Sequence, residues 1–262
     1  AIQQEVGLQL RHTVGRYMLR RTKEEKLDAL PAKHLWIGDE TLAEGGTQFH
    51  AGLVGRMQGR QQAAYDQVLQ NVHDLDADKR ALILSSLPKL RQICIHHDIE
   101  AIQPASATSQ LIAESINASC KIQSLITILD EVKQKAEKVI IFATTKAIQS
   151  YLSFVLSARY NLAIDIVNGE TKAISNSTNV GTRKSILAEF EDKDGFNIVI
   201  MSPVAAGVGL TVIGANNVIH LEHHWNPAKE AQATDRVYRI GQKKEVNVYM
   251  PIATHPSIRT FD

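Results

Sequence analysis

The 262-residue chain has little of several features that would place it in a specialised class of protein. It contains two cysteines, Cys94 and Cys120, and neither lies in a CxxC pair, so neither a disulfide framework nor a thiolate zinc site is encoded. No run approaches the roughly 18 consecutive apolar residues of a membrane span, and the first residues lack the layout of a secretion signal. We therefore expect a soluble, intracellular protein without a membrane partner.

Net charge is also nearly absent, because 29 Lys and Arg residues stand against 28 Asp and Glu residues. Such a balance gives no overall attraction to a polyanion, so any contact with nucleic acid must come from a local patch. One patch lies early: residues 11–33 carry seven Lys and Arg residues against three acidic ones. On spacing alone, a solvated helix face followed by a linker is the favoured interpretation of this patch.

The spacing of the hydrophobic residues, which make up 44% of the chain, changes near residue 120. Before that point they recur at helical spacing in residues 65–72 and 81–93. Residues 31–59 indicate an irregular or short-strand connector, and residues 99–119 indicate a loop.

After residue 121, short apolar blocks alternate with helical segments. Strands are predicted at residues 139–142, 163–167, 198–201, 218–221 and 246–250, and helices at 122–135, 144–158, 183–191 and 227–238. Almost wholly apolar strands between helices are typical of a parallel sheet that is covered on both faces. This half is therefore predicted to be an α/β layer domain whose functional groups lie at the carboxyl ends of its strands.

Two arginines in residues 232–242 are the most specific chemical signal. Arg236 and Arg239 stand three apart and would project from one face of a helix. The planar guanidinium donates two hydrogen bonds to a phosphate at once and keeps its charge. Aimed at a γ-phosphate, such groups would stabilise the departing phosphoryl group, an effect worth on the order of 10³–10⁵ in rate. Taken alone, the simpler interpretation is that they pair with Asp235 and Glu230.

Residues 202–211 follow a predicted strand and include Gly207 and Gly209. Because glycine lacks a Cβ, backbone N–H groups there could approach a phosphate or a sugar. A tight structural turn explains two glycines at least as well, and the third glycine of a dinucleotide-binding fingerprint is missing. The pattern GxxxxGK[ST] occurs nowhere, so the chain cannot hold a triphosphate through a P-loop of its own.

Adjacent histidines follow another predicted strand, at His223 and His224. Neighbouring side chains point apart and no further ligand stands at i+4, so no metal site is predicted there. The same reasoning rejects a metal at His96-His97. Trp225 is interpreted as an anchor of this loop, and the proline after it as the start of a helix.

In combination these segments resemble the Swi/Snf family of helicase-like, DNA-translocating ATPases, and specifically the second RecA-like lobe of their two-lobed motor. The resembling segments are residues 138–142 (motif IV), 165–171 (the strand and glycine after it), 202–210 (motif V), 217–227 (ending in Trp-Asn-Pro), 232–242 (motif VI), 18–25 with 30–31 (the basic connector between lobes) and 90–97 (Leu-Arg-Gln-Ile-Cys-Asn-His in the family). The chain departs from motif V, where Pro203 and Ala206 replace the usual threonine and first glycine.

The resemblance implies an organisation and a set of functional residues. A RecA-like three-layer lobe with a parallel sheet would span residues 119–262, after a basic connector and brace at 1–58 and a mainly helical subdomain at 59–118. ATP with Mg²⁺ would be held mainly by an N-terminal lobe, so the chain is expected to be a piece of a longer protein and inactive as an ATPase alone. The implied arginine fingers are Arg236 and Arg239, the ATP contacts are Gly207, Gly209, Gln232 and Asp235, and the contacts to the backbone of double-stranded DNA are Asn168, Gly169, Arg183, Ser202 and Trp225.

Two other functions stay open at this point. The chain could be a RecA-like DNA- or protein-binding module that does not hydrolyse ATP, although such a module has no need of two convergent arginines. It could also be a dinucleotide-dependent enzyme, which the missing third glycine disfavours. The compact spacing of the motifs favours a bacterial protein, cytoplasmic and associated with the nucleoid, over a nuclear one.

Overall fold

The computed structural model describes residues 30–43, 46–73, 80–102, 107–171, 182–206 and 210–262. The chain divides into two compact units, Ala1–Leu30 and Pro31–Asp262, and the description below concerns the second. Most of the basic patch and the whole loop 172–181 lie outside the described residues. Within the described part, no helix is long and apolar enough to cross a membrane.

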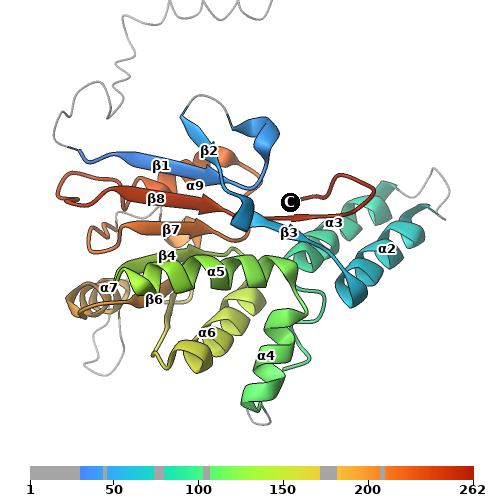
Figure 1. Cartoon of the computed structure of the whole chain (residues 1–262), viewed down its shortest axis with the longest axis horizontal. Helices are drawn as coiled ribbons and strands as arrows, with labels where there is room; N and C mark the ends of the chain where they lie inside the picture. The colour runs from blue at the N-terminus through green and yellow to red at the C-terminus, as the bar shows by residue number, and fades with distance from the viewer. Residues whose placement is uncertain (1–29, 44–45, 74–79, 103–106, 172–181, 207–209) are drawn as a thin grey trace, which may run out of the picture. The chain divides into compact units, whose positions relative to one another are not determined.

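A seven-stranded sheet forms the centre of this unit (Figure 1), with the strand order β2-β1-β8-β7-β4-β6-β5. Every pairing in it is parallel. The strands are β1 (Lys33–Ile37), β2 (Thr47–Phe49), β4 (Lys138–Phe142), β5 (Asp165–Val167), β6 (Asn197–Met201), β7 (Asn217–His220) and β8 (Val246–Met250). Two further short strands, β3 (Val54–Arg56) and β9 (Ile252–Thr254), pair with each other in parallel.

The helices connect these strands and extend the lobe at one side. They are α2 (Gly59–His73), α3 (Arg80–Ile95), α4 (Ser109–Asn117), α5 (Cys120–Gln134), α6 (Lys146–Tyr160), α7 (Arg183–Asp192), α8 (Pro203–Ala206) and α9 (Pro227–Thr234), with short 3₁₀ turns at Glu40–Leu42 and Ala51–Leu53. Local sequence sets several starts: Thr182 closes a capping box at α7, and Asn226 caps α9 directly before its first-turn proline.

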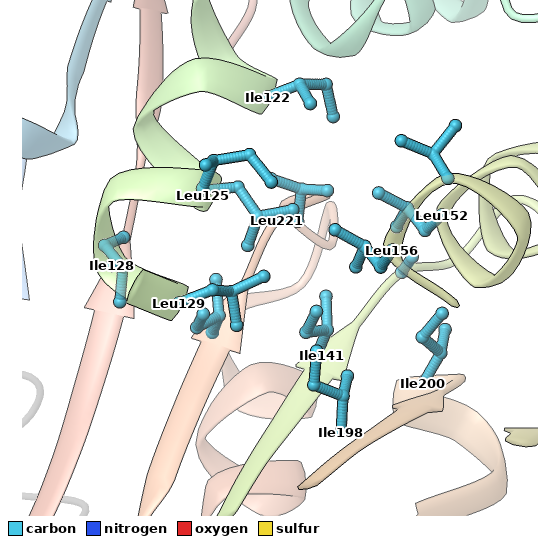
Figure 2. Close-up of a cluster of buried hydrophobic side chains, with 14 of the residues drawn as sticks. Ile122, Leu125, Ile128, Leu129, Ile141, Leu152, Leu156, Ile198, Ile200 and Leu221 are labelled. Atoms are coloured by element: carbon cyan, nitrogen blue, oxygen red, sulfur yellow. The ribbon is translucent and has the colours of Figure 1, made fainter. Parts of the chain in front are cut away.

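The main core lies between the sheet and the helices α5 and α6. Figure 2 shows Leu125 and Leu129 of α5 facing Ile141 of β4, with Leu152 and Leu156 of α6 beside them. Alternate residues of the strands point to the other face of the sheet. Helix α9 packs on that face, and α8 lies against α9. The predicted α/β sheet with helices on both faces is thereby confirmed.

Two predicted elements differ from the structure. The segment 99–119 was expected to be a loop, yet it contains α4, which begins at the N-cap Thr108 and buries Ile112 and Ile116 four residues apart. The polar residues around these two positions make the helical spacing of the apolar residues hard to detect in the sequence. In addition, β1 and β2 from the expected connector extend the main sheet through the pairing of β1 with β8. The domain division at residues 58 and 118 stays a prediction.

The helix predicted to run to residue 238 ends at Thr234, so the prediction was wrong by four residues. Residues 235–237 form a turn and residues 238–239 a bend instead. Val237 and Tyr238 are buried, and the carbonyl of Arg236 accepts a hydrogen bond from Val212 N at 3.1 Å. The bond from Val212 N thus occupies the carbonyl that a continuing helix would pair with the N–H of residue 240. The argument that both arginines share one helix face therefore does not apply.

Candidate functional site

Four neighbouring strands, in the order β7, β4, β6, β5, end at the same edge of the sheet because all pairings are parallel. The residues that follow these ends include Trp225 after β7, Ser202 after β6, and Asn168 with Gly169 after β5. Sequence reasoning expected functional groups at the carboxyl ends. The fold brings these predicted DNA contacts to one edge, named here the carboxyl edge.

The turn after β5 is held by the side chain of Asn168. Its Nδ2 donates to Gln149 Oε1 at 2.8 Å, and its Oδ1 accepts from Glu170 N at 2.9 Å. Arg183 braces the same turn, because its Nε donates to Thr171 O at 2.8 Å and its Nη2 to Gly169 O at 3.2 Å. Asn168 and Arg183 therefore shape the turn, and Gly169 and Glu170 are its exposed residues.

Ser202 begins the connection after β6. Its backbone N donates to Val167 O at 2.9 Å, which fixes the end of β6 against β5. Its carbonyl accepts from Ala206 N at 3.1 Å and so opens the one-turn helix α8. The residue is partly exposed. The predicted ATP contacts Gly207 and Gly209 lie outside the described residues.

Glu222 is a residue of this edge that sequence reasoning left without a role. Its Oε2 accepts from the backbone N of Thr144 and of Thr145, each at 2.7 Å, and its Oε1 accepts from Thr145 Oγ1 at 2.7 Å. The side chain of Thr145 makes no cap of its own, so this carboxylate satisfies the positive end of α6. The sequence signal that could have revealed this role is an acidic residue directly after an apolar strand.

Trp225 is exposed over 67% of its surface, so its side chain does not pack into the loop as the anchor that the sequence suggested. The guanidinium carbon of Arg91, on α3, lies 4.4 Å from the centre of the indole ring. The backbone around the ring is fixed, because His224 N donates to Glu230 Oε1 at 2.7 Å and Asn226 Oδ1 accepts from Ala228 N at 3.0 Å. Trp225 therefore stands out from a rigid loop.

The arginine segment lies beyond the end of α9. Arg239 is exposed, and its Nη1 donates to Thr211 Oγ1 at 3.0 Å. Arg236 is partly buried. Further along, Gln242 Nε2 donates to Ile213 O at 3.1 Å and to Ala215 O at 2.8 Å, directly before β7 begins. The segment thus runs beside residues 211–215 towards the amino ends of the strands.

The partners of Arg239 and Glu230 differ from those that the sequence offered. Within the described residues Arg239 has no carboxylate partner. The Glu230 carboxylate, which the sequence offered as a partner, instead faces His223 Nδ1 at 3.3 Å. Burial alone would raise the pKa of Glu230, but the contact with His223 and the bond from His224 N lower it. Gln232 is exposed on α9, and partly exposed Asp235 caps the end of that helix.

His220 joins β7 to α9 beneath this surface. Its Nε2 and Thr234 Oγ1 are hydrogen bonded at 2.8 Å, and its ring stacks on Phe142 with centroids 5.1 Å apart. Complete burial lowers the pKa of His220 to about 4. The residue is therefore neutral at pH 7 and belongs to the packing of the lobe. Among the described residues, no group of three or more His, Cys, Asp or Glu side chains could hold a metal ion.

Comparison with known proteins shows which proteins this chain is similar to. Residues 120–241 match the model of the helicase conserved C-terminal domain. The chain is 35% identical over 254 residues to the Zorya protein ZorD of Escherichia coli O139:H28, covering 97% of this chain and 22% of ZorD. It is 28% identical over 251 residues to the putative ATP-dependent helicase/translocase YwqA of Bacillus subtilis, covering 94% of this chain and 24% of YwqA. These matches confirm the predicted resemblance to a helicase C-terminal lobe.

A solved Swi/Snf ATPase core shares the fold of this chain. The Sulfolobus solfataricus SWI2/SNF2 ATPase core in complex with dsDNA superimposes with a TM-score of 0.59 at 25% identity, over 94% of this chain and 46% of that one. The chain is thus a Swi/Snf-type helicase C-terminal lobe with a RecA-like fold, as the sequence predicted. It spans less than a quarter of the length of the two relatives named above.

Proposed function

We propose that the chain is the second RecA-like lobe of an ATP-dependent translocase that moves on double-stranded DNA. Membership of a helicase-like ATPase family supports the coarse part of this function. YwqA carries the name of a helicase or translocase, and the Sulfolobus core was solved with double-stranded DNA. For this chain, the substrate, the partner lobe and the roles of single residues are our proposals.

The observation that carries the proposal is the gathering of separate motifs at the carboxyl edge. Asn168, Gly169, Ser202 and Trp225 follow three different strands, yet the parallel sheet aligns their positions along one edge. The edge offers backbone groups, a hydroxyl and an aromatic ring, which suit phosphates and sugars better than bases. Exposed Lys146, which is ion-paired with exposed Glu170 beside the same turn, adds a cation that the sequence did not single out.

The role proposed for Arg236 and Arg239 is to meet the γ-phosphate of an ATP that a first lobe presents. Exposed Arg239 is bonded to the neutral hydroxyl of Thr211, so no carboxylate among the described residues has to be displaced before it contacts a phosphate. A guanidinium in that position stabilises the negative charge that develops during phosphoryl transfer. When the two lobes close and open, the DNA-contact site of one lobe would then move relative to that of the other.

ATP and Mg²⁺ fit this lobe only as groups shared with another lobe. The sequence has no GxxxxGK[ST] pattern, and the described residues hold no acidic or histidine cluster for a metal. When bound, the magnesium nucleotide supplies the phosphoryl group whose transfer drives the cycle. Gly207, Gly209, Gln232 and Asp235 remain the predicted contacts from this side. We therefore propose that the lobe alone hydrolyses no ATP.

The proposal predicts how the isolated chain behaves with DNA and ATP. It should bind duplexes of unrelated sequence equally, because its contacts are to phosphate and sugar. With about four phosphate contacts, affinity should fall on the order of 100-fold between about 50 and 200 mM salt. Fluorescence anisotropy with two labelled duplexes measures both properties, and a phosphate-release assay measures ATP turnover. Turnover by the chain alone, or salt-independent binding to one sequence only, would contradict the proposal.

A further inference from the structure

Arg91 and Trp225 meet although they belong to separate parts of the lobe. Arg91 lies on α3, in the helical segment before the RecA-like part, and Trp225 lies in the loop after β7. The guanidinium carbon stands 4.4 Å from the centre of the indole ring, within the range of a cation–π contact. Figure 1 draws α2 and α3 beyond the ends to which the arrows of β7 and β8 point. The stack therefore connects α3 to the carboxyl edge.

Both partners are held by their surroundings. Arg91 directly follows Leu90, and Leu90 and Ile93 are 2% and 1% exposed, so packing fixes the rotation of α3 about its axis. On the other side, the loop of Trp225 is fastened by the three hydrogen bonds of Glu222 to the turn after β4. The backbone is therefore held in place at both residues of the stack.

The stack leaves the guanidinium N–H donors and one surface of the indole free for a further contact. A guanidinium that lies over an aromatic ring keeps its N–H donors, which lie in its own plane, available to a phosphate. Within the described residues, the Arg91 side chain pairs with no carboxylate. The indole is 67% exposed and offers an apolar surface to a deoxyribose.

We propose that Arg91 and Trp225 form a single contact site for the phosphodiester backbone of duplex DNA, in which Arg91 binds a phosphate and Trp225 packs against the adjoining sugar. The site rests on the proposed function and extends the carboxyl edge onto α3. Arg91 has a second effect, because its stacking holds the indole in the orientation that the sugar meets.

The experiment compares variants of the chain in binding to a labelled 30-base-pair duplex over a range of salt concentrations. Arg91→Met removes the charge and the stack, so the salt slope should fall by about 1 and affinity should fall further as the indole loosens. Arg91→Lys keeps the charge but not the planar fork, so the slope should be retained while affinity drops about two- to fivefold. Trp225→Ala should lower affinity without changing the slope.

The matched control is Arg159→Met. Arg159 also contacts an aromatic ring, Tyr160, but it lies at the end of α6 and pairs with Asp130. Its loss should leave the salt slope and affinity at the parental values. Circular dichroism melting curves check that all variants fold. Tryptophan fluorescence gives an independent readout: DNA should quench the parent more than Trp225→Phe, in which only Trp36 remains.

Two results would overturn the proposal, and they have different consequences for the proposed function. If the parent binds DNA and Arg91→Met behaves like Arg159→Met in both slope and affinity, the site is wrong while the proposed function stands. If the parent does not bind duplex DNA at any salt concentration, the proposed function falls and the site falls with it.

Discussion

His220 couples the stability of the lobe to pH because its imidazole is fully buried between β7 and α9. Burial lowers the pKa of His220 from the usual 6.5 to about 4, against the opposing influence of Glu230. Between these two values the unfolded chain binds a proton that the folded chain does not. The contribution of His220 is therefore complete above pH 6.5 and is lost as the pH falls towards 4.

We predict that this loss amounts to about 3 kcal/mol between pH 7 and pH 4, from a pKa difference of roughly 2.5 units. Urea unfolding of the parent and of His220→Gln at several pH values measures it. The variant should be less stable at pH 7 but should show a flatter decline. Burial also lowers the pKa values of His96 and His97, so the difference between the two proteins is the quantity to compare. Parallel curves would exclude His220 as the source.

The functional residues illustrate what sequence can predict at this scale. The motifs supplied the positions of Asn168 and Trp225, whereas the contacts of these residues could not be derived from spacing. The side chains of Asn168 and Arg183 hold the turn after β5, and Trp225 stacks on a residue of a distant helix. Such contacts depend on which elements the fold brings together.

At the scale of elements, a buried ion pair joins α5 to the last residues of the chain. Lys121 Nζ and Asp262 Oδ1 are 2.5 Å apart, with side chains 0% and 7% exposed. The other oxygen of Asp262 accepts from Ala253 N of β9 at 2.6 Å. The pair thus holds the β3–β9 strands and the final segment against the start of α5.

We predict that Asp262→Ala destabilises the lobe by about 3–5 kcal/mol, because it leaves the buried ammonium of Lys121 uncompensated. Replacing both residues, as Lys121→Met with Asp262→Leu, should recover most of that loss. Guanidinium unfolding of the parent, the single variant and the double variant measures the difference. A cost below about 1 kcal/mol for Asp262→Ala would show that the pair is not sequestered from water.

The elements with long apolar patterns were predictable, and those set by neighbours were not. The strands β4, β6 and β8 and the helices α5 and α7 agree with their predicted ranges to within a few residues. The end of α9 was missed because the bond between Val212 N and the carbonyl of Arg236 belongs to another segment. The helix α4 was missed because it has only nine residues and stands in a segment that contains Pro104 and many Ser, Thr and Gln residues.

At the scale of the whole lobe, the parallel α/β class was predictable from nearly continuous apolar strands, whereas the strand order was not. The pairing of β1 with β8 joins positions such as Leu35 and Val248, and no local pattern encodes so distant a partner. The same holds for the carboxyl edge, whose residues become neighbours only through the order of β7, β4, β6 and β5.

The central claim is that Arg239 acts on the phosphate of ATP within a DNA-stimulated motor. It is tested most directly by the ATP turnover of the full-length protein, with and without duplex DNA, for the parent and for Arg239→Ala. We predict that the variant loses on the order of 10³-fold in DNA-stimulated turnover while still binding DNA, and that Arg159→Ala keeps parental turnover. DNA-stimulated turnover of Arg239→Ala equal to that of the parent would contradict the account.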